Sequence, residues 1–187
     1  MAFTFANNPP VEGPALVGQN LQGLAALPPE WRADEIHITD PPMEIFEAGV
    51  EDAAANRVLS KAAPNGWRYL LLRGEVPVAD AEVDTFGGVV GFRSSSTGRY
   101  LAETISVLQR AEALPELAGA DFEVRFLRVF GLSFAALWFH REAPEQDFVL
   151  PLTSNETLER GAAYLGGEFA ERIAVLAKRF LSGRLMP

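Results

Sequence analysis

A loop rich in glycine and hydroxyl residues is the first part of the sequence that could do chemistry. It runs from Gly87 to Arg99, between an expected strand and the start of an expected helix. Backbone amides at a helix N-terminus bind anions, and arginine side chains add charge-assisted hydrogen bonds. The pattern therefore predicts an anion-binding site for phosphate or carboxylate, formed by Arg93, Ser94, Ser95, Ser96, Thr97 and Arg99. Because the P-loop and dinucleotide-binding spacings are missing, the alternative is a strand end followed by helix-capping residues.

Carboxylates at every second position form another candidate site. Asp80, Glu82 and Asp84 fall on one face of an expected strand. Hard cations such as Mg²⁺ or Ca²⁺ take such oxygen ligands, so the spacing predicts a metal site. The alternative is a solvated strand face on which the carboxylates pair across the sheet with arginines, namely Arg68, Arg73 or Arg125.

The chain has two histidines, His37 and His140, and neither has a neighbour at the spacing of a zinc site. His140 could act as a catalytic base with Asp147 and a serine, but the sequence has no Gly-x-Ser-x-Gly elbow to supply that serine. The pattern therefore favours surface histidines. We predict no catalytic residue and no cofactor on this basis.

A strand that is apolar on both faces indicates a protein interface. Along the expected strand 132–141, hydrophobic side chains occupy both the even and the odd positions. Such a strand is covered twice, by a helix of this chain, by the N-terminal segment or by a partner subunit. We therefore name Phe134, Trp138 and Phe139 as interface candidates and expect a homodimer.

The elements that position these residues follow the order α-β-β-(β)-α-β-β-β-α. Hydrophobic periodicity predicts helices over residues 48–63 and 98–114, and a last helix that follows a capping pattern at 153–156 and has a stripe from Leu158 to Phe180. Strands are expected over residues 67–73, 78–86, 89–92, 122–130, 132–141 and 147–152. The fold class is α+β, with helices packed on an antiparallel sheet of about five strands.

Residues 1–47 are predicted to form an irregular, proline-rich N-terminal arm ahead of a single α+β domain at 48–187. Three proline pairs interrupt regular structure in this segment, although a short strand over residues 35–39 fits its alternation. Its many apolar residues favour packing on its own domain, and docking on another subunit is the alternative.

Composition excludes several classes of protein. The chain has 187 residues, no cysteine and a net charge of −9, with the acidic excess almost wholly within residues 1–90. Disulfides and thiolate metal sites are excluded, and acidic surfaces repel the phosphates of nucleic acids. The N-terminus lacks the pattern of a signal peptide, and no apolar run has the length of a membrane span. We expect a cytoplasmic protein.

These observations favour a non-catalytic protein-binding module: an adaptor, a chaperone-like protein or an assembly subunit that self-associates. The order of elements resembles that of roadblock-type adaptor domains and secretion-chaperone-like domains, which are small, usually dimeric binding modules. No sequence motif accompanies the resemblance, so no family is assigned. The alternatives are a small-molecule or anion-binding protein, or an enzyme, that uses the Gly87–Arg99 loop, and an acidic protein that mimics nucleic acid or neutralises a toxin.

Overall fold

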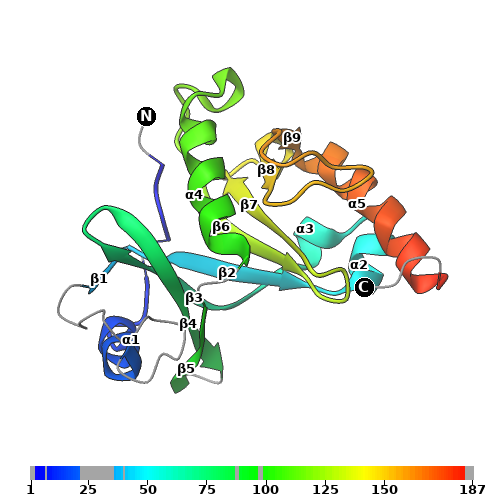
Figure 1. Ribbon diagram of the computed structural model, residues 1–187. Helices are drawn as coiled ribbons and strands as arrows, with labels where there is room; N and C mark the ends of the chain where they lie inside the picture. Colours follow the sequence, from blue (N-terminus) through cyan, green and yellow to red (C-terminus); the bar gives the residue numbers. More distant parts are fainter. Residues whose placement is uncertain are drawn as a thin grey trace.

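A computed structural model describes residues 3–6, 8–21, 36–39, 41–86, 89–96 and 99–183, which form a mixed α/β fold (Figure 1). The described helices are α1 (Gly13–Leu21), α2 (Val50–Ala54), α3 (Val58–Lys61), α4 (Arg99–Glu112) and α5 (Gly166–Leu181), with 3₁₀ turns η2 (Pro115–Leu117) and η3 (Pro144–Gln146). The strands are β1 (Ile36–Ile38), β2 (Met43–Ala48), β3 (Ala63–Arg73), β4 (Val76–Phe86), β5 (Val89–Ser96), β6 (Glu123–Val129), β7 (Phe134–His140), β8 (Phe148–Pro151) and β9 (Tyr164–Leu165). No described helix is long and apolar enough to cross a bilayer.

All nine strands belong to one sheet, in the order β5-β4-β3-β2-β6-β7-β8-β9, with β1 paired beside β3. Every pair is antiparallel except β2 and β6, which run parallel from Glu44–Arg125 to Ala48–Val129. The predicted sheet of about five antiparallel strands was therefore too small. The expected irregular arm contains α1, β1 and β2, and β2 joins the β3–β5 hairpins to the β6–β9 meander.

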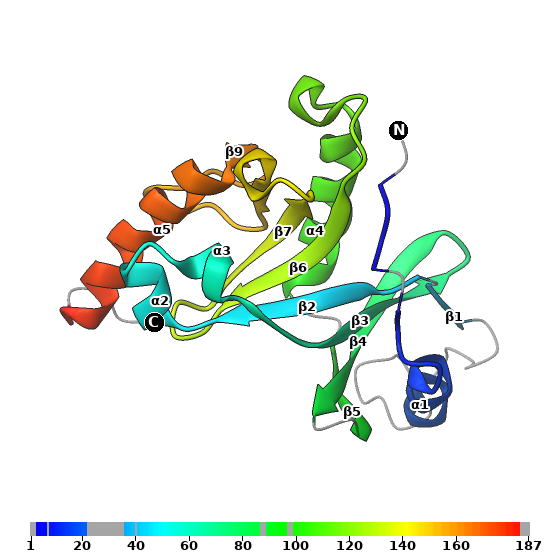
Figure 2. The same cartoon turned by 180° about the vertical axis from the view of Figure 1, so that it is seen from behind.

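The two faces of the sheet are covered by different helices. α4 covers one face and buries Ile45, Phe126, Leu137 and other apolar side chains in one hydrophobic cluster. On the opposite face, α2, α3 and α5 cover the strands β2, β6, β7 and β8, and α1 covers β3 and β4 (Figure 2). The side chains alternate along each strand, so every strand near the centre of the sheet contributes to both faces.

The β7 strand is apolar on both faces because the chain itself covers it twice. Phe134 and Trp138 are each 5% exposed and pack in the cluster under α5, whereas Phe139 is fully buried in the cluster under α4. These three interface candidates are buried within the chain itself, and the interface stays a prediction. Self-association stays a prediction, but β7 no longer supports it.

The described part of the N-terminal segment packs on its own chain. Thr4 forms a parallel bridge beside β6, where its backbone N donates to Phe122 O at 2.9 Å and its O accepts from Val124 N at 2.8 Å. Phe3 and Phe5 pack against the cluster under α4. The predicted strand over 35–39 is observed as β1. Residues 22–35 lie outside the described residues.

Three predicted element boundaries were wrong for local reasons. The helix expected over 48–63 is broken into α2 and α3 at Asn56, whose φ is +60°. The last helix begins at Gly166, because the side-chain oxygen of Asn155 accepts hydrogen bonds from the backbone N atoms of Thr157 and Leu158. This closes a turn in place of a helix cap. β5 continues to Ser96, beyond the expected end at 92.

Candidate functional site

A cleft of about 420 Å³ lies where α3, the N-terminus of α5 and η3 meet the ends of β7 and β8. Its volume is within the range of small-molecule sites. The described residues that line it come from four separate segments: Asn56, Arg57, Leu59, Ser60, Trp138, His140, Pro144, Glu145, Asp147, Gly166, Gly167 and Ala170.

A hydrogen-bonded group of three side chains forms the inner part of this cleft. Trp138 and His140 are two residues apart on β7 and therefore project from the same face. Asp147 directly precedes the neighbouring strand β8. Its Oδ2 accepts from Trp138 Nε1 at 2.7 Å and lies 3.0 Å from His140 Nδ1. The tryptophan and imidazole rings meet edge to face, with their centroids 5.3 Å apart.

The hydrogen bonds of Asp147 determine which nitrogen of His140 carries the proton. Asp147 is 1% exposed, and its second oxygen, Oδ1, accepts from the backbone N of Arg141 at 2.9 Å. Trp138 Nε1 and Arg141 N can only donate to this carboxylate. An ionised carboxylate only accepts, so Nδ1 of His140 must donate. Nε2 is then the acceptor, on a side chain that is 24% exposed and lines the cleft.

The rim of the cleft carries further polar groups. The break at Asn56 places Arg57 and Ser60 there; the Ser60 hydroxyl donates to Arg57 O at 3.2 Å, and Arg57 pairs with Asp52 at 3.0 Å. The first turn of α5 is tied to the same loop, because Gly166 N donates to Asp147 O at 2.8 Å. No side chain caps this helix.

The geometry of the cleft suits proton exchange with a small molecule. A histidine that donates through Nδ1 to a buried carboxylate has a fixed orientation, and its bare Nε2 can accept a proton as a general base. The sequence favoured His140 as a surface histidine. Its partly buried position beside Asp147 corrects that interpretation.

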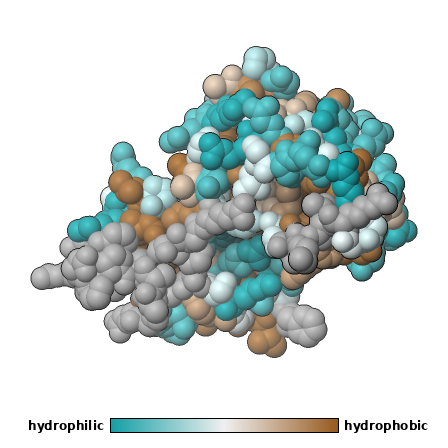
Figure 3. Space-filling model, turned by 45° about the vertical axis from the view of Figure 1, so that its right-hand side comes forward, coloured by the Kyte–Doolittle hydropathy of each residue, from teal (hydrophilic) through white to brown (hydrophobic). Residues whose placement is uncertain are grey.

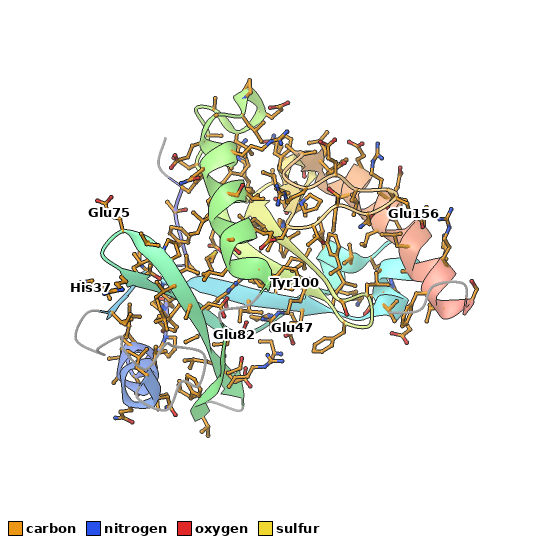
Figure 4. All side chains as sticks on the ribbon, in the orientation of Figure 1. His37, Glu47, Glu75, Glu82, Tyr100 and Glu156 are labelled. Carbon is orange, nitrogen blue, oxygen red and sulfur yellow. The ribbon has the colours of Figure 1, made fainter. Side chains whose placement is uncertain are left out.

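The predicted metal ligands lie on the opposite face of the sheet, in a network of ion pairs. Asp80 pairs with Arg68, Glu82 with Arg128, and Asp84 with Arg93 at 3.3 Å. Glu47 on β2 accepts from Arg93 and Arg128, at 3.3 and 3.4 Å. Glu47 and Glu82 lie close together next to the N-terminal end of α4, where Tyr100 is labelled (Figure 4).

This network is largely buried, which the expected solvated strand face did not anticipate. Asp80 is 4% exposed and Glu82 is 5% exposed, because α4 covers their strand. Burial alone would lower the pKa of Arg128, but the hydrogen bonds and charges of Glu82 and Glu47 outweigh it and raise that pKa. Each predicted ligand has an arginine partner, and no group of three or more potential metal ligands occurs among the described residues. The metal site stays a prediction.

Most of the predicted anion-binding loop belongs to strand β5. Ser94, Ser95 and Ser96 pair through the backbone with Glu82, Ala81 and Asp80 along β4. Arg93 pairs with carboxylates of the chain itself, and Arg99 is the first residue of α4. Thr97 lies outside the described residues. The anion-binding site stays a prediction.

Comparisons of the chain with protein-family models, with curated proteins and with solved structures found no match. The geometry of the chain is therefore the basis for any functional conclusion.

Sequence reasoning named His140 and Asp147 but missed Trp138 as their partner. It assigned Trp138 to an interface, although the i, i+2 spacing of Trp138 and His140 on one strand places both on the same face. A buried indole also requires an acceptor for its N–H, and Asp147 is that acceptor here. The contributions of α3 and α5 depend on tertiary packing and had no sequence signal.

Proposed function

We propose that the protein binds a small polar molecule in the cleft at His140 and that His140 exchanges a proton with it as a general base or acid. The observation that carries this proposal is the hydrogen bond from His140 to the buried carboxylate of Asp147. Such pairing orients an imidazole and stabilises its protonated form once it has accepted a proton. General acid–base catalysis of this kind contributes roughly 10²–10⁴-fold to a reaction rate.

The walls of the cleft support a polar ligand. Ser60, Arg57 and Glu145 place hydroxyl, cationic and anionic groups at its rim. Gly167 at the start of α5 faces open space, since a Cβ added there would have no atom within 4 Å. A ligand could therefore approach the backbone closely at this point.

The protein-binding module predicted from the sequence stays a prediction, with less support than before. Both faces of β7 are covered within the chain, and the described N-terminal residues pack in cis. The large exposed hydrophobic residues of the described chain belong to several elements: Val11, Val76, Val89, Phe130, Leu165, Val175 and Leu181. On the face in Figure 3, described hydrophobic residues lie among hydrophilic ones. Protein-binding surfaces typically show larger apolar patches.

Nitrogen-15 NMR of the imidazole rings tests the proposal, because the chain has only two histidines and the exposed His37 serves as an internal reference. At a pH where His140 is neutral, we expect a proton on Nδ1 and a bare Nε2. Asp147→Asn should shift that tautomer. A neutral His140 with its proton on Nε2 would leave no base in the cleft and would refute the proposal.

Binding is tested separately by titration with acetate, acetamide and glycerol. We expect at least one of these polar probes to shift the His140 ring and the Gly167 amide together. A matched titration of His140→Gln should lose the response at Gly167 if the ring contacts the probe. If none of the probes perturbs either group in the wild-type protein, a polar ligand is excluded from the cleft.

A further inference from the structure

A second cavity lies on the other face of the sheet, under the N-terminal segment and beside α4. Its volume is about 210 Å³, and the described residues that line it are apolar apart from Thr39 and Arg68. The apolar lining residues are Phe5, Pro41, Met43, Leu70 and Leu108. Alternation along β3 separates this cavity from the His140 cleft, because Arg68 and Leu70 project toward α4.

Arg68 has a hydrogen-bonding group without an acceptor. The side chain is 2% exposed; its Nη2 donates to Asp80 and its Nη1 donates to Thr104 Oγ1 at 3.3 Å. The guanidinium also stacks on Phe126, with Cζ 4.1 Å from the ring centroid. Among the described residues, nothing accepts from Nε. A buried donor without an acceptor is unfavourable, so its presence in a side chain that lines a cavity indicates a missing oxygen.

Thr39 adds a second donor to the same cavity. Its Oγ1 accepts from Leu70 N at 2.9 Å, while its backbone N donates to Leu70 O at 2.9 Å. A hydroxyl whose oxygen accepts one hydrogen bond still carries a hydrogen that can donate another. Both polar groups that line the cavity are therefore suited to an acceptor oxygen.

The charged side chains near the cavity favour an uncharged ligand over an anionic one. The charge of Arg68 is already compensated by Asp80, and the remaining network adds Arg93 and Arg128 against Glu47, Glu82 and Asp84. Among the ion pairs of the described side chains, four carboxylates therefore stand against three arginines. An anionic ligand would meet net repulsion in a poorly solvated place.

From these observations we propose that this cavity binds a small uncharged molecule with a carbonyl oxygen on an apolar body. The oxygen accepts from Arg68 Nε and the Thr39 hydroxyl, and the apolar body packs against Phe5, Met43 and Leu108. A cavity of about 150 Å³ holds benzene, so this one has room for a six-membered ring with a short carbonyl substituent.

Three probes of nearly the same shape test the proposal: acetophenone, α-methylstyrene and benzoate. Methyl NMR of the Met43 and Leu108 side chains measures their binding. We expect saturable binding of acetophenone. α-Methylstyrene replaces the carbonyl oxygen by CH₂ and should bind at least about tenfold more weakly, because Arg68 Nε would stay unsatisfied. Benzoate should also bind more weakly, because of its charge.

Two variants control the location of binding without touching Arg68. Leu108→Phe fills the cavity and should abolish acetophenone binding, while Ile105→Phe, on α4 but outside the cavity lining, should retain it. Equal affinity for acetophenone and α-methylstyrene would refute the proposal that Arg68 and Thr39 bind a carbonyl oxygen of the ligand. Absence of binding by all three probes, with an ordered water on Arg68 Nε, would overturn the proposal as a whole.

Discussion

The role of Asp147 leads to the most demanding prediction. Asp147→Ala removes the acceptor of three donors: Trp138 Nε1, His140 Nδ1 and Arg141 N. His140 is partly exposed and can turn to water, whereas Trp138 is 5% exposed and its indole N–H becomes an unsatisfied buried donor. Such a donor costs about 1–3 kcal/mol, and the released loop adds the loss of the Arg141 bond at about 1 kcal/mol. We expect a total loss of about 2–4 kcal/mol.

Thermal unfolding measures this loss. For a chain of this length, 1 kcal/mol corresponds to roughly 2–4 °C in Tm, so Asp147→Ala should unfold about 4–16 °C below the wild type. Asp121→Ala is the matched control, because Asp121 is an exposed aspartate. If both variants lose the same small amount, Asp147 does not hold the end of β7, and the orientation assigned to His140 has no basis.

Three further predictions concern single side chains. Burial raises the pKa of Glu44 despite the nearby charge of Arg125, so the folded state holds this proton more tightly and loses stability as the pH rises through the window above its unfolded pKa. Glu44→Gln should therefore raise Tm at pH 7 and have no such effect below about pH 4 in a pH series of melting curves. Ser133 has a φ of +47°, a backbone conformation that favours glycine. Ser133→Gly should therefore raise the free energy of unfolding in urea by about 0.5–1 kcal/mol. A lower free energy of unfolding would show that the backbone at Ser133 is not strained. Asn155→Ala should cost about 1 kcal/mol in the same assay, since two backbone N–H groups lose their acceptor, while Ser154→Ala should cost less.

Local patterns predicted the meander and the central hairpin well. Alternation and β-branched or aromatic residues identified β3, β4, β6, β7 and β8 within a few residues, because these strands carry their pairing signal in contiguous sequence. β2 was missed because Pro41 and Pro42 precede it and because it is stabilised by neighbours distant in sequence. Its parallel partner β6 begins only at Glu123. No pattern in the local sequence predicts that two strands so far apart in the chain pair in parallel.

The candidate site, like the sheet, could be predicted from the sequence only in part. His140 and Asp147 could be linked from the sequence because seven residues form a short connection between adjacent antiparallel strands. The cleft around them could not be predicted. It needs the break at Asn56 and the late start of α5 at Gly166, both of which oppose the helix periodicity of their segments. At both positions, the conformation overrides local helix propensity.

The positions of the arginines that pair with the three carboxylates of β4 indicate a structural role for these ion pairs. The sequence suggested Arg68, Arg73 or Arg125 as partners, whereas Asp80, Glu82 and Asp84 pair with Arg68, Arg128 and Arg93. Arg128 belongs to β6, so its bonds to Glu82 on β4 and Glu47 on β2 connect strands on both sides of the parallel junction.

The ion pairs of Arg128 help to determine the register of β2 relative to β6. A shift of β2 by one residue would turn Glu47 away from Arg128 and would exchange Ile45 and Phe46 between the two faces of the sheet. The shifted chain would leave the partly buried Arg128 and the buried Glu47 without each other, which is unfavourable. The hydrophobic pattern of β2 is weak in this respect, since Ile45 and Phe46 are both apolar and either face could accept them. The charges therefore specify the register that the apolar residues leave open.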